Sequence, residues 1–201
     1  MKRATRRRVL LTGLVGGVVA VAGTGVARAS NPEPDGLDAP PEVRSAFGTP
    51  ALQGQGRLRF LGLRVYDAVL WTPAGQRVTA ADAASQALAL EIRYQRALQG
   101  QQIAERSLLE MRRQGDLDDV VAQRWLQTMT GLFPDVVEGS RITAVNLPRE
   151  GARFFVDGRL KGSVAEPDFA RRFFGIWLSP QSSDQKLRLA LLGQGQASPR
   201  P

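Results

Sequence analysis

The sequence has 201 residues, with 27 lysines and arginines against 19 aspartates and glutamates, a formal net charge of +8, and neither cysteine nor histidine. This composition excludes disulfides, cysteine nucleophiles, Ser-His-Asp triads and histidine metal sites. Only Lys161 and Lys186 follow residue 29, so a Ser-Lys dyad is not expected. Acid–base chemistry is left to carboxylates, Tyr66, Tyr94 or water polarised by arginine. We expect neither a metal nor a cofactor.

Residues 1–29 have the pattern of an export signal. Five basic residues among the first eight precede an apolar, glycine-rich run, and Ala27-Arg28-Ala29 fits a small-x-small cleavage site. The order Thr5-Arg6-Arg7-Arg8-Val9-Leu10 resembles a twin-arginine motif, which directs proteins that fold before export. We therefore expect cleavage after Ala29 and a periplasmic or otherwise exported protein. An ordinary secretory signal and an uncleaved anchor remain the alternatives.

The charge of the chain changes when this segment is removed. Residues 1–29 hold six basic residues and no acidic one, so residues 30–201 carry 21 basic against 19 acidic residues, a net charge of +2. No basic stripe with interleaved aromatic residues follows, and nucleic-acid binding is not expected. No apolar run long enough to span a membrane follows the signal either. The sequence predicts no particular oligomeric state.

The remaining chain divides into three parts. Residues 30–50 are rich in proline and predict a linker or extended arm. Residues 51–193 suffice for one domain with one core. Residues 194–201 are polar and predict a disordered tail.

The run from Gly54 to Trp71 is the densest in strand-forming residues. Leu58 and Phe60 alternate with arginines, and a second alternation begins after Gly62. A glycine at this change of phase suits a bulge or bend. We therefore expect two strand segments joined by a kink, near the middle of a sheet.

Further elements follow in chain order. Residues 87–94 predict an amphipathic strand whose polar face is solvated. Helical spacing predicts one helix over 101–113. It predicts a second helix that begins at an N-cap, Asp116, and ends at Pro134. Residues 140–147 predict a strand, and Asp157-Gly158 predicts the turn of a hairpin over 152–164. Two last helices are expected from Pro167 and over 184–192. Strands, helices, strands and helices in segregated runs favour an α+β fold, an antiparallel sheet covered on one side by helices.

Four motifs occur together over most of 51–193. They are Gly54-x-Gly56 before Leu63-Arg64-Val65-Tyr66-Asp67-Ala68, then Ile103-Ala104-Glu105-Arg106-Ser107, Phe133-Pro134-Asp135-Val136 and Phe169-Ala170-Arg171-Arg172-Phe173-Phe174-Gly175-Ile176-Trp177-Leu178. Together they resemble the chalcone isomerase-like family, in particular its exported bacterial branch. The resemblance implies a large antiparallel sheet with a helical layer against it and a ligand cleft between the two.

The catalytic pattern of the plant enzymes in this family is not matched. Their arginine falls on Leu58 and their threonine on Leu61, while their tyrosine and asparagine fall on Ile103 and Glu110. Without groups that orient the substrate and polarise its ketone, transition-state stabilisation is lost. We expect little or no chalcone isomerase activity. If the match on the first strand is shifted by one residue, the arginine position falls on Arg57 or Arg59. The same shift would also turn the side chains of that strand to the opposite face of the sheet.

Non-enzymatic members of the family bind fatty acids in the equivalent cleft, so the resemblance implies an apolar small molecule or fatty acid as ligand. An apolar cleft with buried arginines suits a long-chain carboxylate. The candidate ligand-binding residues are Arg57, Arg59 and Arg106 as cations, with Tyr66 and Tyr94 as hydroxyl donors.

Two alternatives differ in class. One is an isomerase, an intramolecular lyase, acting on a small apolar substrate with Glu105 or Glu110 as base. Ion pairs on the protein surface account for the presence of these two glutamates more simply. The other is a structural or partner-binding role in the cell envelope, which exposed aromatic residues of 169–177 would support.

Overall fold

The computed structural model describes residues 37–83 and 85–195. The predicted export signal lies outside those ranges, as do residues 30–36 of the predicted linker and 196–201 of the predicted tail. The described residues form one compact unit. Over the described ranges, no helix is both long and apolar enough to cross a membrane.

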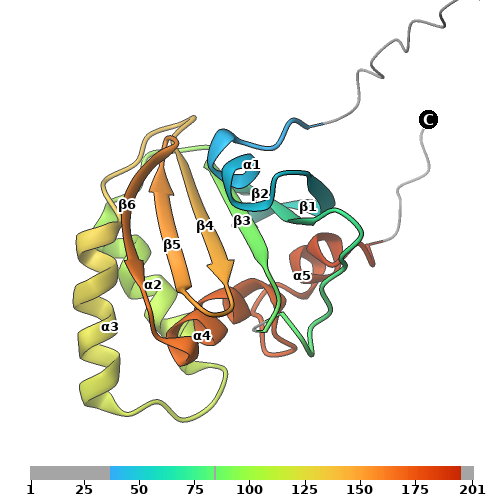
Figure 1. Ribbon diagram of the computed structural model, residues 1–201. Helices are drawn as coiled ribbons and strands as arrows, with labels where there is room; N and C mark the ends of the chain where they lie inside the picture. Colours follow the sequence, from blue (N-terminus) through green and yellow to red (C-terminus); the bar gives the residue numbers. More distant parts are fainter. Residues whose placement is uncertain (1–36, 84, 196–201) are drawn as a thin grey trace, which may run out of the picture. The chain divides into compact units, whose positions relative to one another are not determined.

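The fold is built on one antiparallel sheet whose strands lie side by side in sequence order (Figure 1). Six strands form it within the described part of the chain: β1 (Pro50–Phe60), β2 (Leu63–Pro73), β3 (Leu88–Tyr94), β4 (Arg141–Leu147), β5 (Gly151–Val156) and β6 (Arg159–Val164). The same described residues also form five helices: α1 (Pro41–Phe47), α2 (Gly100–Arg112), α3 (Asp119–Leu132), α4 (Pro167–Leu178) and α5 (Gln185–Leu191). This architecture confirms the predicted α+β fold and its layer of helices.

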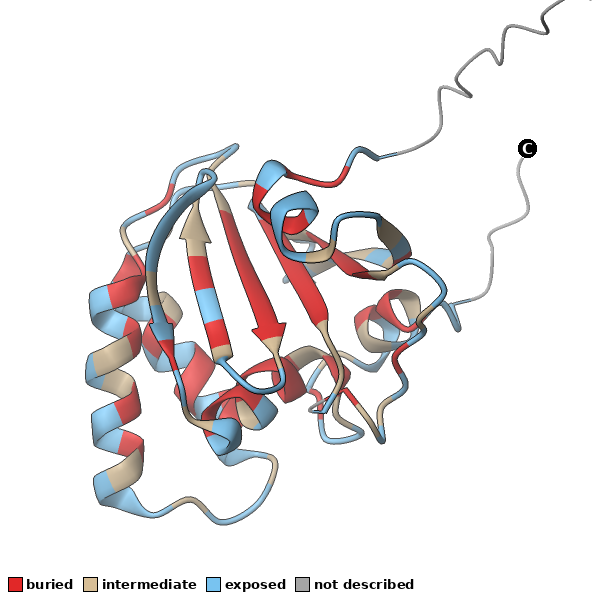
Figure 2. Ribbon diagram, in the orientation of Figure 1, coloured by how far each residue is buried: buried red, intermediate tan, exposed pale blue. Residues whose placement is uncertain are grey.

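The main core lies between the sheet and α2 to α5. Alternate residues of β3, namely Leu88, Leu90, Ile92 and Tyr94, point into it, as the period of two predicts. Phe169 and Phe173 stack one helical turn apart on α4, with ring centroids 5.7 Å apart. They pack against Phe154 of β5. The buried residues in Figure 2 follow this inner face of the helices.

The predicted linker over 30–50 is wrong where the structure describes it, because α1 occupies 41–47 and β1 begins at Pro50. Pro41 stands in the first turn of α1, where its missing N–H costs nothing and its fixed φ suits a helix. Val43 is fully buried against the sheet. The predicted domain start at residue 51 is therefore too late.

The prediction of a solvated polar face on β3 is also wrong near the centre of the sheet. A second, smaller core of Val43, Val69, Trp71, Ala89 and Val145 forms beneath α1. Glu91 is buried there and accepts a hydrogen bond from Trp71 Nε1 at 3.1 Å. A hydrogen bond to the carboxylate offsets part of the cost of burying it.

The predicted kink at Leu61-Gly62 is a two-residue hairpin turn. Both residues have positive φ, 49° and 80°, and Phe60 pairs with Leu63 across the turn. β1 stands at one end of the strand order and is therefore an edge strand rather than a central one. The Asp157-Gly158 turn has the same geometry, with φ of 47° and 81°, and confirms the predicted hairpin. The N-cap of α3 is Asp118 rather than Asp116.

Candidate functional site

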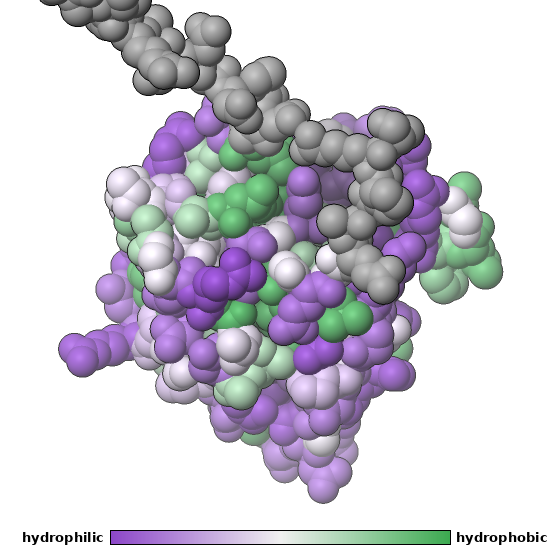
Figure 3. Space-filling model, turned by 90° about the vertical axis from the view of Figure 1, so that its right-hand side faces the viewer, coloured by the Kyte–Doolittle hydropathy of each residue, from purple (hydrophilic) through white to green (hydrophobic). Residues whose placement is uncertain are grey.

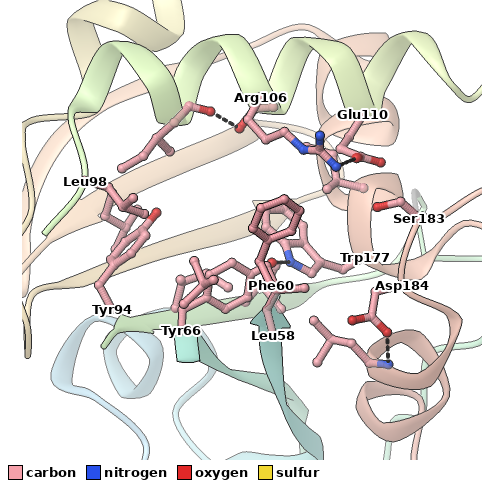
Figure 4. Close-up of a pocket in the computed structure, with 18 of the residues that line it drawn as sticks. Leu58, Phe60, Tyr66, Tyr94, Leu98, Arg106, Glu110, Trp177, Ser183 and Asp184 are labelled. Carbon is pink, nitrogen blue, oxygen red and sulfur yellow. Dashed lines mark hydrogen bonds and ion pairs between the residues drawn. The ribbon is translucent and has the colours of Figure 1, made fainter. Parts of the chain in front are cut away.

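A cavity of about 630 Å³ lies between the sheet and α2, α4 and the segment that leads into α5. Figure 4 shows side chains from both layers converging on it. Most of its wall is apolar, contributed by Leu58, Leu90, Ile92, Leu98, Ile103, Ile142, Phe173, Ile176 and Leu187. Such a volume and lining are typical of a binding site for a small molecule.

The two tyrosines of the chain stand side by side in the wall. Tyr66 of β2 and Tyr94 of β3 are cross-strand partners, and their rings meet edge to face with centroids 6.1 Å apart. Trp177 of α4 donates a hydrogen bond from Nε1 to the Tyr66 hydroxyl at 2.8 Å. The Tyr66 oxygen is the acceptor in that bond, so its own proton is left for another partner.

Both tyrosines stay protonated at neutral pH. Burial raises the pKa of Tyr66 above its ordinary value; the hydrogen bond from Trp177 and the charge of Arg106 oppose that shift, and Asp184 and Glu110 add to it. Burial likewise raises the pKa of Tyr94. Among the described residues, none hydrogen-bonds the Tyr94 hydroxyl. Each ring therefore presents a neutral O–H donor.

Charged groups gather where α2 meets the cavity. Arg106 forms an ion pair with Glu110 one turn along the helix, and Arg113 lies 3.5 Å from the second carboxylate oxygen of Glu110. The Glu110 side chain is only 6% exposed, and its Oε2 has no hydrogen-bond partner among the described residues. Figure 4 shows the Arg106–Glu110 pair on the cavity side of α2.

The segment before α5 closes the same end of the cavity. Ser182, Ser183 and Asp184 line it. Asp184 caps α5 by accepting a hydrogen bond from the Leu187 amide at 2.9 Å. This carboxylate is thus held by the helix terminus. The part of the chain that the structure describes holds no cluster of acidic residues suited to a metal ion.

Four of the five predicted ligand-binding residues line the cavity: Arg59, Tyr66, Tyr94 and Arg106. Arg57 does not. It forms an ion pair with Asp67, its cross-strand partner on β2. Neighbouring residues of a regular strand face opposite sides, so Leu58 lines the cavity and Arg57 does not. The register of β1 shifts between Leu58 and Arg59, and the alternation does not continue there, so Arg59 lines the cavity as well.

Arg96 was not predicted as a lining residue. It comes two residues after Tyr94, and residues two apart in an extended segment lie on the same side of the chain, so this spacing was a usable signal. Trp177 was expected only as an apolar side chain of its helix that could fill the cleft. Its role as donor to Tyr66 depends on a pairing 111 residues apart in sequence.

Three of the four positions matched to the plant enzymes, Leu58, Ile103 and Glu110, line the cavity. The fourth, Leu61, is 87% exposed at the hairpin turn. Leu58 and Ile103 give apolar wall where the plant pattern has an arginine and a tyrosine.

The sequence of the chain matches the chalcone isomerase-like family over residues 33–193. The chain belongs to this family. A fatty-acid binding protein from Arabidopsis thaliana has a similar structure, with a TM-score of 0.55 and 16% sequence identity over 72% of this chain and 87% of that one. At that identity the likeness shows the fold alone.

A relative at the sequence level comes from Haemophilus influenzae. This protein of uncharacterized function is 33% identical over 111 residues, which make up 53% of the chain and 52% of the relative. The chain therefore matches about half the length of that relative.

Proposed function

We propose that this chalcone isomerase-like protein binds a fatty acid or another apolar carboxylate in the cavity between sheet and helices, without chalcone isomerase activity. The structurally similar Arabidopsis thaliana protein is a fatty-acid binding protein. That likeness supports the proposal at the level of the fold, and the chemistry of the cavity supports it independently.

The observation that carries the proposal is an apolar cavity with neutral hydroxyl donors and arginines in its wall. An acyl chain gains from leaving water in proportion to the apolar surface it buries. The Tyr66 hydroxyl accepts from Trp177 and keeps its proton free for a carboxylate oxygen. The charged lining residues are three arginines (Arg59, Arg96 and Arg106) against two carboxylates. This balance favours an anionic head group.

Arg106 is the cation we assign to the ligand carboxylate. A guanidinium has five N–H donors, and the bond to Glu110 leaves others available. Arg113 also approaches Glu110, so two arginines share one carboxylate and the group retains positive charge. Arg106 and Tyr66 both line the cavity, so we expect the ligand carboxylate to lie between them.

The test is a titration of the protein with a fluorescent fatty acid, comparing R106Q with the unaltered protein. Hydrogen bonds to charged groups contribute about 1.5–3 kcal/mol, so we expect R106Q to weaken binding by tenfold or more. R57Q is the matched control, since Arg57 is an arginine outside the cavity, and its affinity should not change. Equal affinities in R106Q and R57Q would remove Arg106 from the site.

A long-chain alcohol separates recognition of the charge from recognition of the chain. It should compete for the cavity with similar strength in R106Q and in the unaltered protein, because it carries no carboxylate for Arg106. Failure of both ligands to bind the unaltered protein would contradict the proposed function itself.

A second candidate is an isomerase acting on a small apolar substrate. Glu110 favours it, as a buried carboxylate at the cavity with one oxygen that lacks a hydrogen-bond partner. Glu105 is exposed and bonded to Gln101, so it is not the base. Turnover of enone substrates that E110Q abolishes would favour this candidate.

The envelope partner role loses the support that exposed aromatic residues would have given, because Phe169, Phe173 and Phe174 are buried. Export remains part of our proposal. It rests on the sequence of residues 1–29 alone.

A further inference from the structure

The turn between β1 and β2 exposes three large apolar side chains together. Phe60 is 65% exposed, Leu61 87% and Leu63 57%. Figure 3 shows a hydrophobic tip projecting at the right of the view, beyond the mostly hydrophilic surface around it. We call these three residues the apolar tip. Exposed apolar groups that gather in this way mark interaction sites.

Leu61 is unfavourable at its position for a second reason. Its φ of 49° lies in the left-handed region, where the Cβ of a leucine clashes with the following carbonyl oxygen. Asparagine, aspartate or glycine is the usual residue in such a turn, as in the Asp157-Gly158 turn of the same sheet. Strain of this kind is found at functional sites.

Two arginines stand directly behind the apolar tip. Arg59 and Arg64 are cross-strand partners, one residue further from the turn than the Phe60–Leu63 pair. Like charges directly opposite each other destabilise a strand pair. Neither arginine side chain forms an ion pair or hydrogen bond with any described residue, in contrast to Arg57, whose side chain pairs with Asp67. An anionic partner would remove this repulsion.

We propose that the apolar tip inserts into the interface of an anionic lipid bilayer while Arg59 and Arg64 contact the lipid head groups. Two residues of strand separate Leu61 from Arg59, about 7 Å at the usual rise per residue. That separation matches the depth of about 5–10 Å to which interfacial elements bury their apolar side chains. A protein at a bilayer surface is expected to place its positive charges at the level of the lipid head groups. Its apolar side chains are expected to lie deeper.

The proposal places the lipid surface beside the cavity. Phe60 and Arg59 belong both to this hairpin end and to the cavity wall, and Phe60 extends from the end of β1 toward the cavity (Figure 4). An acyl chain would thus pass between bilayer and cavity along Phe60. The docking itself does not depend on which ligand the cavity holds.

The absence of cysteine allows a site-specific test on the whole chain. L61C carries an environment-sensitive fluorophore and is mixed with vesicles of phosphatidylcholine, with or without phosphatidylglycerol. We expect a blue shift with the anionic vesicles and quenching by lipid-bound quenchers. Because the label reports its own surroundings, binding through another part of the chain does not imitate the result.

L160C is the matched control. Leu160 is also exposed, at 61%, and lies between Arg159 and Lys161, but on β6 at the opposite edge of the sheet. The fluorescence of a label at position 160 should not shift on addition of vesicles. Substitutions R59Q and R64Q should each weaken the response of L61C by about fivefold.

Three results would overturn the proposal. They are no shift at position 61, equal shifts at positions 61 and 160, and a shift at 61 that arises from self-association without vesicles. The last of these would identify a second copy of the chain as the partner of the apolar tip.

Discussion

Tyr66 and Tyr94 are the only tyrosines in the sequence, and burial raises the pKa of both. Between about pH 10, the ordinary tyrosine pKa, and the raised values, the unfolded chain releases two protons that the folded chain retains. Stability is therefore complete below about pH 10. It is lost as the pH rises further, by about 1.4 kcal/mol per pH unit for each tyrosine.

The measurement is a urea denaturation series across alkaline pH, together with the ultraviolet absorbance of tyrosinate. We expect no tyrosinate signal before unfolding begins, and a flatter pH dependence in Y66F and Y94F. A gradual tyrosinate signal from a folded protein near pH 10 would show that water reaches the two hydroxyls freely.

Leu61 offers a prediction in which stability and docking change in opposite directions. L61N places a residue that tolerates positive φ in the turn and removes an exposed apolar side chain. We expect the variant to be more stable by about 1 kcal/mol, with Tm raised by about 2–4 °C. Thermal unfolding measures the gain, and binding to anionic vesicles should fall. L160N, on a strand with ordinary φ, is the control and should show no gain in stability.

At the scale of elements, the contact of β1 with α5 depends on Gly54 and Gly56. A Cβ on Gly54 would overlap the backbone carbonyl oxygens of Ala190 and Leu191. A Cβ on Gly56 would meet Leu187 Cδ1 at 2.6 Å, the mobile end of a side chain. The glycines of the family motif thus let a helix lie directly on the edge strand.

G54A should therefore destabilise the protein more than G56A. We expect a loss of about 2–3 kcal/mol for G54A, because backbone must move, and about 1 kcal/mol for G56A. Urea denaturation followed by tryptophan fluorescence compares the two. Ligand affinity should fall further in G56A, because its new methyl group meets Leu187, which lines the cavity. Equal losses would show that α5 adjusts freely on β1.

Elements with regular periodicity were predictable from the sequence. The alternation over 87–94 predicted β3, Asp157-Gly158 predicted the β5–β6 turn, and Pro167 predicted the start of α4. The first hairpin was not predicted, since Leu61 is a poor residue for its turn. α1 was not predicted either, because proline is found both in the first turn of a helix and where a helix is broken.

The lining of the cavity was more predictable from the sequence than the contacts within it. Residue type and resemblance selected Arg59, Tyr66, Tyr94 and Arg106, all of which line the cavity. The sequence did not reveal that Arg57 is neutralised by Asp67 or that Tyr66 pairs with Trp177. Both contacts depend on strand register and helix docking, which periodicity alone does not fix.

At the scale of the whole molecule, we expect one experiment, a comparison of native and denatured masses, to test both export and ligand retention. A signal that resembles the twin-arginine type implies folding before export. The cavity would then form inside the cell, before export, where it can take up cellular lipids. Water in an apolar cavity of about 630 Å³ lacks many hydrogen bonds, so an acyl chain is favoured over it.

We therefore expect protein purified from the envelope fraction to have a denatured mass equal to residues 30–201 and a larger native mass. The excess should match a fatty acid and disappear on denaturation. R106Q is the control, since it should keep the same cleavage and lose most of the excess. A denatured mass of all 201 residues would contradict cleavage and leave the ligand prediction standing. A native mass without excess would contradict retention and leave export standing, so the two predictions fail separately.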